Sequence, residues 1–156
     1  MTKKLVIVAN LGRLKAYRVA KAAPGRGQKL DLVEDINFIN AHTRFRDLVT
    51  DQAGRYGIDT GTAFLKSDYE ALGAKREIQR RLVREVAEEI GRVLEEEEVE
   101  GWYLVAAPEH HDAILEEIRP EHRERLLWSV YADLVKSRPA VVLRQVKEAT
   151  EVKKLI

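Results

Sequence analysis

The run Leu5–Ala9 places the strongest constraint on the fold, because five consecutive apolar residues give a strand no polar face. Three of the five are β-branched, which favours an extended conformation. Such a strand is buried on both faces, so we expect it at the centre of a sheet that is covered on both sides. The chain has 156 residues, a length that suits one domain with one such sheet.

Other segments have the periodicity of strands and helices. Apolar residues at helical spacing predict the longest helix over 75–98, and the four carboxylates Glu95–Glu98 at the negative end of its dipole predict fraying there. A turn at 10–13 predicts a hairpin. Shorter patterns predict strands over 14–20, 30–39, 102–107 and 126–131, a helix over 112–118 ended by Pro120, and a last helix over 140–155 that follows Pro139.

The predicted order is β-β-β-α-β-α-β-α. Three antiparallel strands followed by crossovers predict a single α/β domain, residues 1–156, with a mixed five-stranded sheet covered by helices. The order is similar to the ribonuclease H-like architecture and to the middle domain of archaeal and eukaryotic class 1 release factors. Residues 40–72 lack periodicity, and we predict a mobile loop there.

The net charge of +1 conceals a segregation of charge along the chain. Residues 1–30 hold eight bases and no acid, whereas residues 85–125 hold fourteen acids and four bases. This distribution argues against a general nucleic-acid binder but allows a local basic surface that follows RNA. The alternative is a solvated face that pairs with the acidic region, within the fold or in a homo-oligomer. The candidate surface consists of Lys15, Arg18, Lys21, Arg26 and Lys29.

The composition excludes several classes of protein. The absence of Cys excludes disulfides, thiolate zinc sites and a Cys nucleophile, and it fits a reducing cytosol. The first apolar run is too short for a signal-peptide core, and no stretch approaches the length of a membrane span. We therefore expect a soluble, cytoplasmic protein without a membrane span. No dinucleotide or nucleotide motif occurs, so we expect no cofactor.

One candidate pocket follows from the expected sheet. If the first strand and the strand over 102–107 are parallel neighbours, their carboxyl ends meet, and crevices form at such edges. Asn10 and Arg13 would then approach Pro108, Glu109 and His110. The alternative is that Gly12 in this segment only completes the hairpin.

A second candidate lies in the predicted loop. Asp51, Gly54 and Arg55 form its most distinctive cluster, in which the arginine offers a planar fork to a phosphate or a carboxylate. The alternative is structural, with Asp51 capping a turn, Gly54 at a positive φ and Arg55 paired with Asp51.

The histidines are weaker candidates for a functional site than the two clusters above. His110 and His111 invite a metal or proton-transfer role, but adjacent residues on a helix diverge, so we expect a helix start with Asp112 near its cap and no metal site. We expect His42 and His122 to be solvated. Trp102 and Trp128 are predicted to pack in the core near the sheet edges.

Four stretches in order resemble the family of host attachment proteins, described as required for attachment to host cells. Residues 46–55, Arg-Asp-Leu-Val-Thr-Asp-Gln-Ala-Gly-Arg, resemble its D-L-V-S-D-x-x-G-R signature. Leu104–Pro108 resembles its L-V-A-P-P strand end, and Val130–Leu134 its K-D-L element. The opening Val6–Asn10 also agrees.

The resemblance implies a distant relation to the release-factor middle domain, in which a Gly-Gly-Gln loop follows the third strand. Residues 40–72 contain no such tripeptide; the nearest sequence, Gly25–Gln28, lies one strand too early and has Arg26 in place of a glycine. The strands at 5–9 and 102–107 also lack the carboxylates of a two-metal nuclease.

We therefore expect a non-catalytic binding module that contacts the ribosome, tRNA or a protein partner. The alternatives are a peptidyl-tRNA hydrolase-like release or rescue factor and a protein with an indirect role in attachment to host cells.

Overall fold

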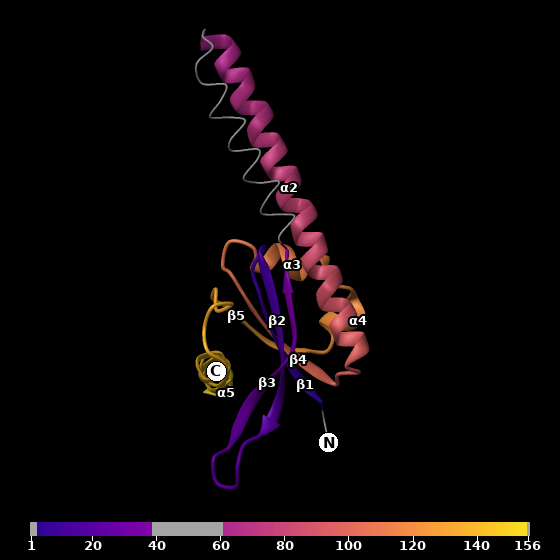
Figure 1. Ribbon diagram of the computed structural model, residues 1–156, viewed down its shortest axis with the longest axis vertical. Coiled ribbons are helices and arrows are strands. Elements are labelled where there is room, and N and C mark those ends of the chain that lie inside the picture. The colour runs from indigo at the N-terminus through magenta and orange to yellow at the C-terminus, as the bar shows by residue number, and fades with distance from the viewer. Residues whose placement is uncertain (1–2, 39–60, 156) are drawn as a thin grey trace.

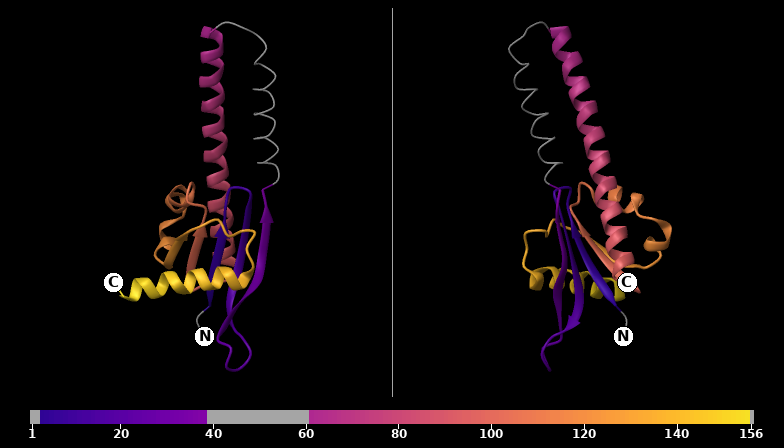
Figure 2. Two further views of the ribbon diagram at one scale, coloured as in Figure 1. Left: turned by 90° about the vertical axis from the view of Figure 1, so that its left-hand side faces the viewer. Right: turned by 45° about the vertical axis from the view of Figure 1, so that its right-hand side comes forward.

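A computed structural model describes residues 3–38 and 61–155 of the chain. One mixed sheet carries helices on both faces (Figures 1 and 2). The elements are β1 (Lys4–Ala9), β2 (Arg13–Lys21), β3 (Gln28–Asn37), α2 (Gly61–Glu96), β4 (Gly101–Ala106), α3 (His111–Glu117), α4 (Pro120–Arg123), β5 (Leu126–Tyr131) and α5 (Pro139–Leu155).

The strand order in the sheet is β3-β2-β1-β4-β5. β1 pairs with β2 and β2 with β3 in antiparallel register, whereas β1–β4 and β4–β5 are parallel. The prediction of a mixed five-stranded sheet with helices is therefore confirmed, and β1 is its central strand.

Both faces of β1 are buried, as its sequence predicts. Leu5, Ile7 and Ala9 belong to the cluster under α2 and α3, while Val6 and Val8 belong to the cluster under α5. Figure 2 shows α5 crossing one face of the sheet and α2, α3 and α4 covering the other. The alternation of side chains along one strand thus joins the two layers.

α2 starts earlier than the sequence predicts. Its first residue is Gly61, so residues 61–72 are helical and not part of a loop. Figure 1 shows this first part extending beyond the sheet, where a helix needs no apolar stripe, and the absence of that stripe explains the wrong start. The remainder of the predicted loop, residues 39–60, lies outside the described residues.

The end of α2 is held by ion pairs. The helix stops at Glu96, and two of the four glutamates that predicted fraying have close cationic partners: Glu97 pairs with Arg18 at 2.6 Å and Glu96 with Arg92 at 2.9 Å. Arg92 also contacts Glu34 of β3 at 2.9 Å, which ties the helix to the sheet.

Three further expectations need correction. Pro120 does not only follow a helix but begins α4, where its missing N–H costs nothing. His122 is 5% exposed rather than solvated, because its ring packs against Gly91 of α2 and its carbonyl accepts a 2.7 Å bond from Trp102 Nε1. Trp102 is buried, whereas Trp128 on the edge strand β5 is 37% exposed.

Candidate functional site

The carboxyl ends of the parallel strands β1, β4 and β5 meet at one edge of the sheet (Figure 1). Backbone bonds continue past the strands: Ala107 N donates to Ala9 O at 3.2 Å, and Ala132 N donates to Ala106 O at 2.9 Å. The three following segments are therefore held side by side. Such an edge is the usual place for a ligand site in an α/β sheet.

Asn10 connects two of these segments. Its Oδ1 accepts the N–H groups of Gly12 and Arg13, both at 2.8 Å, which shapes the β1–β2 turn. Its Nδ2 donates to the two carboxylate oxygens of Asp133, at 3.3 and 3.4 Å. The side chain of Asn10 thus reaches the segment after β5, and its hydrogen-bond partners are not Pro108, Glu109 or His110.

Arg13 lies at the start of β2, and its side chain points toward the neighbouring strand β3. Its Nε and Nη2 donate to the carboxylate of Asp35 on β3 at 2.8 and 2.6 Å. These bonds lower the pKa of Asp35. The structure therefore gives Arg13 a partner on β3.

Glu109 and His110 line a separate open groove of about 790 Å³, which lies between α2 and α3. Pro108, just before them, is exposed. The residues expected to converge at this edge thus occupy three places: Asn10 beside Asp133, Arg13 beside Asp35, and Glu109 with His110 in the groove.

The groove has one cationic and one anionic wall. Arg76, Arg80 and Arg84 project from α2 at four-residue intervals, so they share one face of the helix, about 6 Å apart along its axis. Within the described part of the chain, none of the three pairs with a carboxylate. Glu109, Glu116 and Glu117 form the opposite wall.

Sequence reasoning missed this arginine row. Nearby acids in 75–90 make the segment resemble an ordinary solvated helix face. The four-residue interval was the available signal. The neighbour Arg81 shows the contrast, since it contacts Glu77 at 3.4 Å one turn away.

On the other flank of α3, His111, Asp112 and Tyr131 form a polar and aromatic cluster. His111 is fully buried and its ring stacks on that of Tyr131, with centroids 3.7 Å apart and planes 26° apart. Asp112 Oδ1 accepts the Tyr131 hydroxyl at 2.5 Å and lies 3.0 Å from His111 Nδ1. Because a carboxylate only accepts, Nδ1 carries the hydrogen. The bond with Asp112 raises the pKa of Tyr131, and the bonds from Tyr131 and His111 lower that of Asp112.

The predicted basic surface on β2 and β3 is partly paired. Arg18 contacts Glu97 of the acidic region, and Lys29 lies 3.5 Å from Asp31. Lys15 lies near Asp35 and contributes to its lowered pKa. Lys21 and Arg26 are exposed in and beside the hairpin turn.

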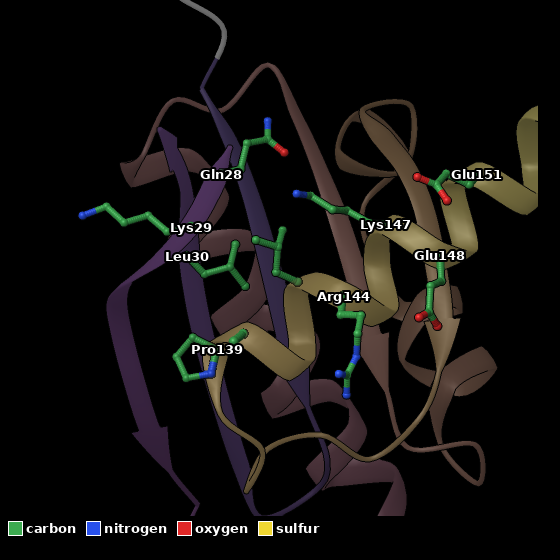
Figure 3. Close-up of a pocket in the computed structure, with 10 residues that line it drawn as sticks. Gln28, Lys29, Leu30, Pro139, Arg144, Lys147, Glu148 and Glu151 are labelled. Atoms are coloured by element: carbon green, nitrogen blue, oxygen red, sulfur yellow. The ribbon is translucent and has the colours of Figure 1, made fainter. Parts of the chain in front are cut away.

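A groove of about 450 Å³ lies between the start of β3 and α5 (Figure 3). Leu30 and Lys147 point into it, whereas Lys29 points away. Two bases, Arg144 and Lys147, and two acids, Glu148 and Glu151, line it from the same helix. This groove therefore presents no wall of a single charge.

The candidate cluster predicted in the loop lies outside the described residues, and so does one histidine. These residues are Asp51, Gly54, Arg55 and His42. Among residues 3–38 and 72–151, no group of three His, Asp or Glu side chains has a geometry that could hold a metal ion. None of the helices in the described segments has the length and hydrophobicity of a membrane span.

The fold and the polar strand ends define an α/β domain with its candidate site beside the carboxyl ends of parallel strands. The family model described as "protein required for attachment to host cells" matches residues 5–146. The chain therefore belongs to the host attachment protein family. A search of curated proteins gives no match.

Proposed function

We propose that the chain is a non-catalytic, cytoplasmic binding module that contacts RNA, on the ribosome or in tRNA, through Arg76, Arg80 and Arg84. The observation that carries the proposal is the row of guanidinium groups on one face of α2, none of which pairs with a carboxylate among the described residues. Guanidinium groups bind phosphate through two parallel N–H bonds, and a row of them suits successive phosphates of a backbone.

The shape of the chain supports the same proposal. α2 extends beyond the sheet (Figure 1), and the arginine row lines the open groove between this helix and α3. The order of elements predicted from the sequence resembles that of the release-factor middle domain, which acts at the ribosome; on this proposal, the chain would keep that architecture and bind without the Gly-Gly-Gln loop. The family's role in attachment to host cells would then be indirect.

The first test measures binding of fluorescently labelled tRNA and of purified ribosomes over a series of salt concentrations. Each neutralised phosphate contributes about 0.7 to 0.9 to the slope of log K against log salt. The variant R76Q/R80Q/R84Q should lose about 2 from that slope and bind at least tenfold more weakly at 100 mM salt. Unchanged slope and affinity would refute the proposal.

Neighbouring positions on α2 supply a matched control. Arg80→Gln and Arg81→Gln remove the same charge from adjacent positions, but only Arg80 lines the groove. Arg80→Gln should weaken binding several-fold more than Arg81→Gln. Equal effects would show that total charge, and not the row, controls binding.

Substitutions in the acidic wall of the groove distinguish an RNA partner from a protein partner. Glu116→Gln with Glu117→Gln removes two charges that repel phosphate, so affinity for RNA should rise. A protein that uses both walls would instead bind this variant more weakly. Release of peptide from peptidyl-tRNA by the purified protein would contradict the non-catalytic part of the proposal.

A further inference from the structure

Tyr131 is an exposed aromatic residue in an unusually constrained position. It is the last residue of β5 and pairs with Ala106 of β4, so it lies at the carboxyl edge of the sheet. It is 55% exposed, the largest exposure among the apolar and aromatic side chains that stand out from the described surface. An exposed tyrosine ring on an edge strand usually has rotational freedom, which a partner must remove on binding.

Two contacts remove that freedom here. The buried His111 covers one face of the ring at a centroid distance of 3.7 Å, and Asp112 Oδ1 holds the hydroxyl at 2.5 Å. His111 is itself fixed, because it is fully buried and its Nδ1 contacts the same carboxylate at 3.0 Å. The ring is therefore held in one orientation, with its uncovered face toward solvent.

Trp128, the other exposed aromatic residue of β5, does not extend this surface. Trp128 pairs with Tyr103, which belongs to the cluster on the α5 side of the sheet. Tyr131 pairs with Ala106, which belongs to the cluster on the α2 side. A single ring face, rather than a wide apolar patch, suits a flat ligand better than a protein surface.

We propose that Tyr131 is a preorganised stacking platform for an unpaired nucleobase. The proposal rests on and extends the RNA-binding function, because α3 faces the arginine row across the groove on one flank and bonds Tyr131 through Asp112 on the other. In this arrangement, arginines bind the backbone and Tyr131 stacks on a base that the same strand leaves unpaired. Stacking of this kind tolerates any base, since each has an aromatic face. The Tyr131 hydroxyl is protonated at neutral pH and donates to Asp112, which anchors the ring.

The test compares single-stranded with duplex RNA of the same length. Tyr131→Ala should weaken binding of a single-stranded decamer about tenfold and leave duplex binding unchanged. Tyr131→Phe keeps the ring and should stay within about threefold of the native protein. Trp128→Ala is the matched control, because it removes an exposed aromatic ring from the opposite face of the same strand. Equal losses for single strand and duplex would overturn the platform.

A phosphate-free probe separates this inference from the proposed function. Adenosine should move the ring-proton resonances of Tyr131 upfield, and R76Q/R80Q/R84Q should leave that shift intact. Suppose that the arginine variant loses RNA binding, adenosine does not shift the Tyr131 ring-proton resonances and Tyr131→Ala has no effect on RNA binding. The RNA-binding function is then supported and the stacking platform is refuted. If adenosine moves Tyr131 while the arginine variant binds RNA normally, the platform stands and the arginine row is wrong.

Discussion

Glu98 occupies a backbone conformation that side chains rarely adopt. Its φ is 51°, and it follows the last turn of α2. Glu98 N donates to Glu95 O at 3.2 Å and Val99 N donates to Leu94 O at 3.4 Å, the two bonds that define a Schellman helix end. Glycine is the usual residue at this place, because it has no Cβ to clash in the left-handed region.

Glu98→Gly should therefore stabilise the protein by about 1 kcal/mol in urea unfolding. Glu98→Ala removes the same charge from the negative end of the helix dipole but keeps the Cβ, so it should gain only about 0.3 kcal/mol. An equal gain from both substitutions would assign the effect to charge and not to the backbone.

The histidines show why single residues were hard to interpret from the sequence. His122 looked solvated among charged neighbours, yet Gly91 on a distant helix leaves space for its ring. His111 looked like part of a helix start, and it is the first residue of α3, but its burial depends on β5 lying beside β4. Contacts between distant segments decided both outcomes.

At the scale of elements, α2 has two parts with different roles. Residues of its second half, including Val86, Ile90 and Leu94, are buried against the sheet, whereas its first part extends beyond it (Figure 1). The apolar stripe therefore predicts the packed half, whereas the extending part has no such stripe and its sequence predicts a loop.

Shortening a buried side chain in the packed half of α2 should lower the free energy of unfolding far more than shortening a half-buried side chain nearer the start of that half. Ile90→Ala removes a fully buried side chain and should destabilise the fold by about 3 kcal/mol. Ile78→Ala, at a half-buried position on the same helix, should cost less than half as much. Chemical denaturation followed by circular dichroism measures both. Similar losses would mean that Ile78 is as firmly packed as Ile90.

At the scale of the molecule, the segregated charges meet within the fold. Arg18 of the basic hairpin contacts Glu97, and Arg92 of the acidic region contacts Glu34 on β3. The two charged regions thus partly neutralise each other in space, while Arg76, Arg80 and Arg84 pair with no carboxylate within the described part of the chain. The basic surface predicted on β2 and β3 is thus partly paired with acids. Among the described residues, the arginine row on α2 is a different basic surface that has no carboxylate partners.

Because β1 contributes side chains to both clusters, the two layers should unfold together. Tryptophan fluorescence and far-ultraviolet circular dichroism should give the same urea midpoint, within error. Val142→Ala, which weakens only the α5 side, should lower both midpoints equally. Separate midpoints would indicate two independently folding layers.

The sequence alone predicts the sheet and its covering helices, because burial imposes a period of two on strands and 3.6 on packed helices. It also predicts that the carboxyl ends of β1 and β4 share an edge, as parallel neighbours do, but Asn10 and His110 do not meet there. It could not determine which side chains pair, because Arg13 with Asp35, Asn10 with Asp133 and Tyr131 with His111 join residues far apart in the chain. Only the tertiary structure decides those distances, and with them which charges and rings stay free to bind a partner.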